Sequence, residues 1–233
     1  MLVIDSEQTV KNRKLFSARG ATIIGLDFAA RNMTFALDED MNLKEEVVSS
    51  FLDTYGQDKF LIFGFTFMVW QHLYNAVEER GLKFDMQMGS LLTGGGWKKL
   101  ESNKVTSAEF KQRGNKLCNI SRFIDHYGMA EQAGSVYYEC EYGHLHASIY
   151  SDVITRKPED FSCCEFGEKG ILQVVSSLPR SYPGNSLLTE DEGVILGEDD
   201  CPCGRKGKYL KVIGRLRNAE LRGCSDTYAA AIS

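Results

Sequence analysis

The chain has 233 residues, 43% hydrophobic and 25% charged, which is the ordinary composition of a globular protein. Its formal net charge of −5 argues against nucleic acid as the main partner, because phosphate binding gathers Lys and Arg on one face. The longest apolar run, Phe60 to Trp70, is well short of the roughly 18 to 20 residues that a membrane span needs, and no secretory signal is present. We therefore expect a cytoplasmic protein without a membrane span.

The first predicted elements alternate between strand and helix. The short apolar run Ala21–Gly25 predicts a strand. Apolar residues at helical spacing then predict a helix over Lys44–Tyr55, which ends at Gly56, a residue type favoured just after helices. The next apolar run, Phe60–Phe63, is typical of a buried strand.

The same alternation continues to about residue 125. A second helix is predicted over Phe67–Arg80, and a strand over Met86–Leu92. Thr106 and the glutamate three residues later have capping-box spacing, so a helix should begin there and run through Cys118. Ile120–Asp125 is the next predicted strand. Strands that alternate with helices indicate an α/β fold with a parallel layer.

After about Gly134 the pattern changes to short strand-like runs separated by turns, so this half should be β-rich. We expect four segments: a lead-in over 1–21, an α/β subdomain over 22–134, a β-rich subdomain over 135–213 and a hinge with a tail over 214–233. The predicted strands of the β-rich part are Ser135–Tyr138, Ile171–Val175, Gly193–Leu196 and Tyr209–Ile213.

Two motifs of the α/β part are candidates for nucleotide chemistry. Thr93–Lys98 is glycine-rich and follows a predicted strand, so its backbone N–H groups are suited to line a nucleotide pocket. Asp125–Glu131 follows another predicted strand and offers an aromatic ring for a base and a carboxylate for Mg²⁺. Taken alone, the first is also compatible with an ordinary glycine-rich turn, and the second with a turn that buries one tyrosine.

Two further motifs lie in the β-rich part. Leu188–Gly193 is interpreted as an acidic tight turn, in which a carboxylate can accept hydrogen bonds from ribose hydroxyls. Ile213–Asn218 places an arginine just after a strand, within reach of ribose or phosphate oxygens. A solvated acidic turn and a surface arginine are the plainer interpretations of each motif by itself.

The order and spacing of these four motifs resemble those of adenylate-forming enzymes. The closer resemblance is to the acyl-protein synthetase family, the fatty-acid-activating component of the bacterial bioluminescence fatty-acid reductase complex. Stretches that carry it include Ala36–Met41, Leu61–Gly64, Tyr127–Glu131, Cys201–Arg205 and Arg222–Cys224, and it covers roughly residues 22 to 225. Ala130 departs from the superfamily pattern, which has a threonine there. Phenylacetate–CoA ligases look like more distant relatives.

The resemblance implies the C-terminal part of an adenylation domain that binds ATP and Mg²⁺. It places Gly95, Gly96, Tyr127, Gly128 and Glu131 around the nucleotide, with Glu131 as the carboxylate nearest Mg²⁺, and it places Asp191 and Arg215 at the ribose. The superfamily carries a Ser/Thr/Gly-rich phosphate loop upstream of these motifs, and no such loop occurs between Met1 and Thr22. We therefore expect a truncated chain, which is a gene fragment, one half of a split gene or part of a longer sequence, and a separate chain is one candidate carrier of the phosphate loop.

The seven cysteines, in a chain without an export signal, favour reduced thiols, a metal site or a reactive thiol over a disulfide framework. Cys201 and Cys203 lie in a glycine-containing turn, while Cys140 and His146 are spaced as on a hairpin, with His144 as a competing ligand. This donor set suits structural Zn²⁺, and four reduced, partly buried side chains are the alternative. Three further cysteines are expected to be packing residues: Cys118, Cys163 and Cys164.

Cys224 lies near the C-terminus beside Arg222, which favours its thiolate. In the resembled family a near-terminal cysteine accepts the activated acyl group as a thioester, so the resemblance implies a ligase that passes a long-chain acyl group from acyl-AMP to Cys224. An acyl-CoA-reductase-like protein would be the partner. An incidental tail thiol is the plainer interpretation of Cys224. Two alternatives remain for the whole chain: an acyl- or aryl-CoA ligase, and an inactive zinc-stabilised binding fragment.

Overall fold

The computed structural model describes residues 1–11, 17–96, 105–132 and 134–216. The chain divides into two compact units, the first over Met1–Ile124 and the second beginning at Asp125. The four segments expected from the sequence stay a prediction. Among the described helices, none combines the length and the apolar character needed to cross a bilayer.

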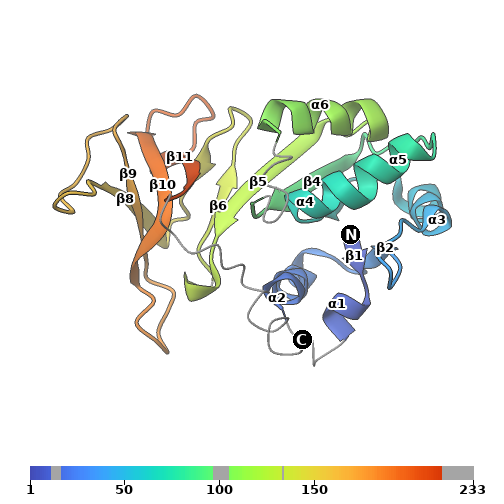
Figure 1. Cartoon of the computed structure of the whole chain (residues 1–233), viewed down its shortest axis with the longest axis horizontal. Coiled ribbons are helices and arrows are strands. Elements are labelled where there is room, and N and C mark those ends of the chain that lie inside the picture. The colour runs from blue at the N-terminus through green and yellow to red at the C-terminus, as the bar shows by residue number, and fades with distance from the viewer. Residues whose placement is uncertain (12–16, 97–104, 133, 217–233) are drawn as a thin grey trace. The chain divides into compact units, whose positions relative to one another are not determined.

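Unit 1 is built on parallel strands in the order β2-β1-β3-β4. Its strands are β1 (Leu2–Ser6), β2 (Thr34–Leu37), β3 (Phe60–Phe63) and β4 (Gly89–Gly94), and β5 (Arg122–Gly128) runs across the division between the units. Its helical elements are α1 (Gln8–Lys11), α2 (Ala18–Gly25), η2 (Asp27–Ala29), α3 (Glu45–Tyr55), α4 (Thr66–Met68), the π-helical η3 (Val69–Tyr74), α5 (Asn75–Glu79) and α6 (Ser107–Cys118) (Figure 1). The predicted parallel α/β layer is confirmed.

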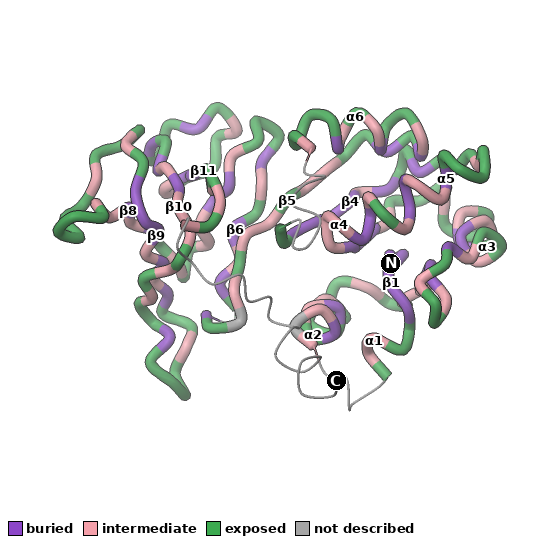
Figure 2. Tube along the Cα trace, viewed as in Figure 1, coloured by how far each residue is buried: buried purple, intermediate pink, exposed green. Residues whose placement is uncertain are grey.

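Alternate residues of these strands enter two separate apolar clusters, as the period of two in a strand requires. One cluster joins Leu2 and Ile4 of β1 to the side chains of α3, η3, α5 and α6. The other joins Val3 of β1 and Phe63 of β3 to Ile23 of α2. Helices therefore cover both faces of the strands, and β1 is buried along its whole length (Figure 2).

Two expectations for the N-terminal part differ from the structure. The expected lead-in contains β1, which pairs with both β2 and β3. The predicted strand Ala21–Gly25 is wrong, because these residues end helix α2. Ser17 caps that helix by accepting a hydrogen bond from the backbone N–H of Gly20, at 3.2 Å. A run of four or five apolar residues does not distinguish strand from helix, and the cap decides it here.

Helix α6 begins where its capping box predicts. The Thr106 side chain accepts a hydrogen bond from the backbone N–H of Glu109, and a Glu109 carboxylate oxygen accepts one from the backbone N–H of Thr106, at 2.7 Å. Both donors would otherwise lack partners at a helix start. The helix ends at Cys118, followed by Asn119 in a left-handed conformation with φ 51°.

Gly114 of α6 lies against the buried Tyr74 hydroxyl, so replacing it with alanine should destabilise the protein. A Cβ at this position would lie within van der Waals overlap of the Tyr74 hydroxyl and 3.0 Å from Phe123. We expect the free energy of unfolding to fall by about 2 kcal/mol in urea titrations, the usual cost of overpacking a core. Gly25→Ala is the matched control, because no atom of the described residues lies within 4 Å of its added Cβ.

A second variant separates this clash from a loss of helix geometry. Among the described residues the Tyr74 hydroxyl has no hydrogen-bond partner, so Tyr74→Phe alone should cost little. Combined with Gly114→Ala, it should recover part of the lost stability, because the nearest clashing atom is gone. Equal stability of Gly114→Ala and the wild type would contradict the assigned packing.

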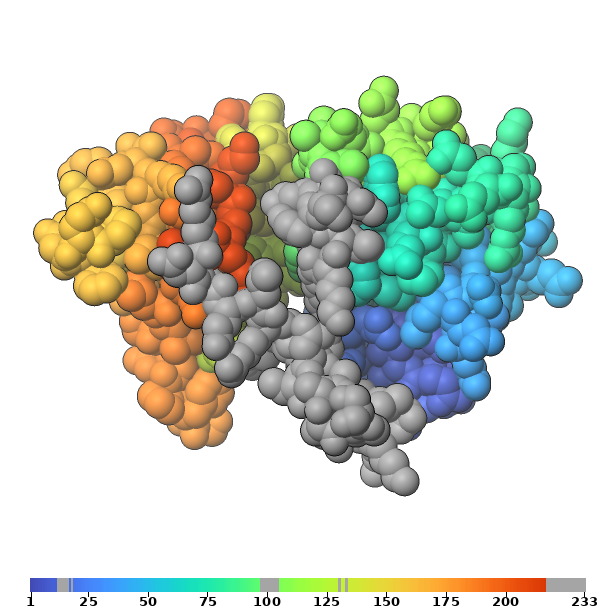
Figure 3. Space-filling view, in the orientation of Figure 1, coloured from blue at the N-terminus to red at the C-terminus, as the bar shows by residue number. Residues whose placement is uncertain are grey.

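Unit 2 is a sheet of antiparallel strands in the order β6-β7-β11-β10-β9-β8, with the end of β5 paired to β6. Its core is a cluster that includes Tyr137, Leu172 and Ile195. The gold and orange atoms of the segment carrying β8, β9 and β10 lie together in the space-filling view (Figure 3). The predicted β-rich half is confirmed. Its elements are η5 (Ala130–Gln132), β6 (Val136–Glu139), β7 (Leu145–His146), β8 (Ser151–Arg156), β9 (Lys169–Ser176), β10 (Ser186–Glu198) and β11 (Lys208–Arg215).

Candidate functional site

Tyr127 and Asp191, predicted from separate motifs, are hydrogen-bonded partners within unit 2. The Tyr127 hydroxyl donates to Asp191 Oδ2 at 2.7 Å. Burial raises the pKa of Tyr127, and the Asp191 carboxylate beside it raises that pKa further. The phenol therefore stays protonated at neutral pH and can hold the carboxylate as a permanent donor. Tyr127 is a residue of β5 itself, not of a turn that follows the strand.

A bulge in β10 places Asp191, where the sequence predicted a tight turn. That prediction is wrong, because residues 188–193 lie inside the strand. Leu188 pairs with Gln173 and Glu192 pairs with Ile171, so β10 has more residues than β9 between these two pairs. Bulges of this kind turn a side chain away from its regular direction.

Thr189 holds the bulge in shape. Its hydroxyl donates to the backbone carbonyl of Leu172 at 2.8 Å and accepts from the backbone N–H of Asp191 at 3.1 Å. The Asp191 side chain remains 22% exposed, so one edge of the carboxylate still faces solvent. Thr189 was not among the predicted site residues, although a threonine two residues before an aspartate is a known turn signal.

Arg215 ends β11 directly opposite Asp191 in the strand register. Its Nη2 donates to Glu190 Oε2 at 2.9 Å, while its Nε lies 3.9 Å from Asp191 Oδ1. The shorter contact shows that Glu190 is the closer partner of the guanidinium. Sequence reasoning missed Glu190, and the only signal for it was its place in the acidic run before Gly193.

Together these side chains form a small polar site, which we call the Tyr–Asp–Arg group: Tyr127, Asp191 and Arg215. Its carboxylate is held by a neutral phenol on one oxygen and lies near a guanidinium on the other. A fixed, partly exposed carboxylate accepts hydrogen bonds from neutral hydroxyl pairs such as those of a ribose. An exposed arginine edge is suited to phosphate or ribose oxygens.

Gly95 and Gly96 follow β4 in unit 1. Gly95 has φ +77°, and a Cβ there would come within 2.9 Å of the Phe65 ring. Among the described residues, none lies within 4 Å of a Cβ built on Gly96. Trp97 and Lys98, the rest of this motif, lie outside the described residues.

Gly128 and Glu131 lie near the start of unit 2. Gly128 is the last residue of β5 and pairs with Val136 of β6. Glu131 belongs to η5 and its side chain is exposed, which suits a ligand for a hydrated cation. The predicted roles of both residues at the nucleotide stay predictions.

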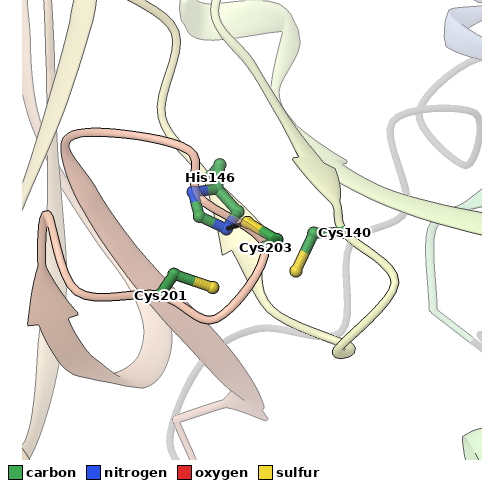
Figure 4. A group of neighbouring side chains, drawn as sticks. All are labelled: Cys140, His146, Cys201 and Cys203. Carbon is green, nitrogen blue, oxygen red and sulfur yellow. Dashed lines mark hydrogen bonds between the residues drawn. The ribbon is translucent and has the colours of Figure 1, made fainter.

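The four predicted metal ligands converge in unit 2. The ligand atoms of Cys140, His146, Cys201 and Cys203 all lie within 4.8 Å of one another, and the first three side chains are buried (Figure 4). Cys140 and His146 come from the β6–β7 hairpin, and the other two come from the loop between β10 and β11. Four such side chains at this spacing could hold a metal ion.

The remaining cysteines differ from one another. Cys118 is buried in the core of unit 1 and Cys164 is half-buried, which fits packing roles. The packing role predicted for Cys163 is wrong, because this residue is exposed. Its backbone forms an isolated antiparallel β-bridge with Arg156. Cys224 lies outside the described residues.

Tyr127→Phe tests whether the phenol supports Asp191. We expect the free energy of unfolding to fall by about 1.5 to 3 kcal/mol, the usual contribution of a hydrogen bond to a charged group. Tyr142→Phe is the control, because this tyrosine is 54% exposed. Chemical denaturation of the three proteins measures the difference, and equal stabilities would show that the hydroxyl contributes nothing to holding the carboxylate.

Comparison with known proteins matches nearly the whole chain to one protein family. The family model described as "Acyl-protein synthetase, LuxE" matches residues 2–233. A curated relative, the long-chain-fatty-acid–luciferin-component ligase of Aliivibrio fischeri, is 25% identical over 145 residues, which cover 61% of this chain and 38% of the relative. The match thus spans well under half of that relative's length.

Solved structures of adenylate-forming enzymes share the fold. A 2-hydroxyisobutyryl-CoA ligase in complex with 2-HIB-AMP and CoA is similar with a TM-score of 0.67 and 17% identity, over 93% of this chain and 45% of that chain. ATP-bound MatB from Rhodopseudomonas palustris has a TM-score of 0.56 at 13% identity, over 92% and 40%. A long-chain-fatty-acid–CoA ligase from Archaeoglobus fulgidus has a TM-score of 0.56 at 14% identity, over 90% and 46%. The predicted fold class is confirmed.

Proposed function

The chain belongs to the LuxE acyl-protein synthetase family, and on this premise we propose that it acts in the ATP-dependent activation of a long-chain fatty acid. The product of the first step is acyl-AMP, and a cysteine thiol is the next acyl acceptor. The observation that carries the proposal is the Tyr–Asp–Arg group, because it offers the fixed carboxylate and the guanidinium that a nucleoside monophosphate requires.

In the first step a fatty carboxylate oxygen attacks the α-phosphorus of ATP. A new P–O bond forms, the bond to the bridging oxygen breaks, and pyrophosphate leaves with its charge offset by Mg²⁺. We assign ribose binding to Asp191 and Arg215, and stacking on the adenine to the Tyr127 ring. Backbone approach to the nucleotide is assigned to Gly95, Gly96 and Gly128, and the Mg²⁺-side carboxylate to Glu131.

In the second step a thiolate attacks the acyl carbon, a thioester forms, and AMP leaves with the electron pair of the broken mixed anhydride. We assign the thiol to Cys224, because the charge of nearby Arg222 favours the thiolate. The thioester would pass to an acyl-CoA-reductase-like partner protein, which would reduce the acyl group to aldehyde with a hydride donor of its own and so free the Cys224 thiol.

The triphosphate end of ATP needs a cradle of backbone N–H groups and hydroxyls. We therefore assay the present chain both alone and with the protein encoded just upstream, which is a candidate source of such a cradle.

The experiment that tests the proposal is fatty-acid-dependent exchange of labelled pyrophosphate into ATP, which reports acyl-AMP formation alone. Exchange is expected with a myristoyl-length acid and Mg²⁺, and it should require both. Exchange that is equal with and without the fatty acid would contradict the proposal, because some other acceptor would then be taking the adenylate.

A further inference from the structure

Two sequence-distant turns of unit 2 bring three thiols and one imidazole to a common point (Figure 4). Cys203 Sγ lies 3.4 Å from His146 Nε2, and all four ligand atoms lie within 4.8 Å of one another. A tetrahedral Zn²⁺ with bonds of about 2.0 to 2.3 Å sets its ligand atoms roughly 3.5 to 3.8 Å apart. The four atoms therefore need only a small contraction to surround one ion.

Each turn is shaped by the chain before any ion is considered. The backbone N–H of Gly143 donates to the carbonyl of Cys140, and that of Gly204 donates to the carbonyl of Cys201, both at 2.9 Å. Gly143 has φ +77° and Gly204 has φ +81°, conformations that favour glycine. Both turns are thus Cys-x-x-Gly turns of the same form, and each holds a cysteine at its start.

Backbone donors also point at the sulfurs of the second turn. The N–H of Cys203 hydrogen-bonds the Cys201 sulfur, and the N–H of Arg205 hydrogen-bonds the Cys203 sulfur. Amide donors of this kind hydrogen-bond metal-bound sulfurs and fix their orientation.

Burial makes the cluster costly without a ligand. Cys140, His146 and Cys201 are each no more than 5% exposed. They carry three polar side chains into the interior. A purely apolar packing role would leave these side chains poorly satisfied, whereas an ion would use the sulfurs and His146 Nε2, the ring nitrogen nearest Cys203 Sγ.

His144 contacts the cluster without completing it. Its Nδ1 lies 3.3 Å from Cys201 Sγ, and its ring stacks on Tyr209 with centroids 4.9 Å apart. His146 also stacks on Tyr209, at 5.7 Å. An imidazole N–H donated to a metal-bound sulfur offsets part of the negative charge that three thiolates leave on a Zn²⁺ site.

We propose that unit 2 binds one structural Zn²⁺ through Cys140, His146, Cys201 and Cys203, with His144 as a positioning residue that hydrogen-bonds Cys201. A set of three sulfurs and one nitrogen in tetrahedral arrangement selects zinc. Four protein ligands leave no open position, so the ion has no place for substrate. Its role is to fasten the loop between β10 and β11 to the β6–β7 hairpin.

Zinc content of the purified full chain, after dialysis against metal-free buffer, tests the proposal. One equivalent of zinc is expected in the wild type and in Cys163→Ser, whose cysteine is exposed and outside the cluster. Cys203→Ser should retain less than about a tenth of an equivalent, because a structural site depends on every ligand. Full zinc in Cys203→Ser, or none in the wild type, would overturn the proposal.

A second measurement covers variants that fail to fold. Wild-type protein stripped with a chelator and titrated with Co²⁺ should show the visible bands of a tetrahedral site and thiolate charge-transfer bands in the near ultraviolet. Absence of both, or a metal-free chain lighter by two hydrogen atoms because two thiols have formed a disulfide, would overturn it.

The two histidines are separated by competition with a zinc chelator. His144→Ala should keep one equivalent of zinc but bind it about 10-fold more weakly, the lower end of the effect of losing an outer hydrogen bond. His146→Ala should lose it. The reverse result would show that His144 is the ligand and would overturn the assignment.

Discussion

Replacing Asp191 with alanine is expected to reduce fatty-acid-dependent pyrophosphate exchange by at least about 100-fold. A ribose held by two hydrogen bonds to a carboxylate gains about 1.5 to 3 kcal/mol from each, and 1.4 kcal/mol corresponds to a factor of ten. The loss should appear mainly as weaker ATP binding, because the ribose contacts are present before and during the reaction.

Two controls sharpen this result. Glu198→Ala removes an exposed carboxylate from the same strand and should leave exchange unchanged. Tyr127→Phe keeps the carboxylate but frees one of its oxygens, so it should cost less than Asp191→Ala. If Asp191→Ala exchanges within about twofold of the wild type, the ribose is held elsewhere and the assignment of the Tyr–Asp–Arg group is wrong.

Replacing Cys224 with alanine is expected to abolish covalent acylation of the chain while leaving pyrophosphate exchange intact. The reason is chemical, since activation of the carboxylate does not involve the thiol, and alanine offers no nucleophile to the acyl carbon. Gel-resolved labelling with a radioactive fatty acid, with and without hydroxylamine, measures the thioester. The exchange assay on the same preparation shows that activation persists.

Cys163→Ala is the matched control for this experiment, because Cys163 is the exposed cysteine among the described residues. It should acylate like the wild type. Label that persists in Cys224→Ala would point to a different acceptor residue. Turnover that survives the substitution and depends on coenzyme A would favour the acyl- or aryl-CoA ligase, the first alternative that the sequence left open.

The fold was predictable where a local signal and the tertiary packing agree. The capping box at Thr106 gives the start of α6, and Phe60–Phe63 is a strand at its predicted bounds. At Ala21–Gly25 the local signal misleads, because a short apolar run is compatible with both a strand and a helix. The strand β1 was missed because the local sequence of Leu2–Ser6 does not indicate that it pairs with strands on both sides, β2 and β3.

The candidate site was predictable by residue but not by geometry. Tyr127 and Asp191 are 64 positions apart, and their contact depends on how β10 is bulged against β9. A shift of one residue in a strand moves every side chain to the other face, and periodicity alone does not fix where such a shift falls. The Glu190–Arg215 pair follows from the same register and was missed for the same reason.

The cysteine cluster could be predicted in part from the sequence. Spacing indicated that Cys201 and Cys203 share a turn and that Cys140 and His146 share a hairpin. Their convergence required β11 to pair with β7, which brings the loop before β11 beside the hairpin. That pairing is long-range, so the sequence offered only the donor chemistry.

Intact-protein mass after incubation with ATP, Mg²⁺ and a myristoyl-length fatty acid tests the central claim most directly. The account predicts a gain of one acyl group that hydroxylamine removes, either in the chain alone or when the protein encoded just upstream is added. No gain in either mixture, from a chain that remains folded with zinc bound, would contradict the account and favour an inactive binding fragment.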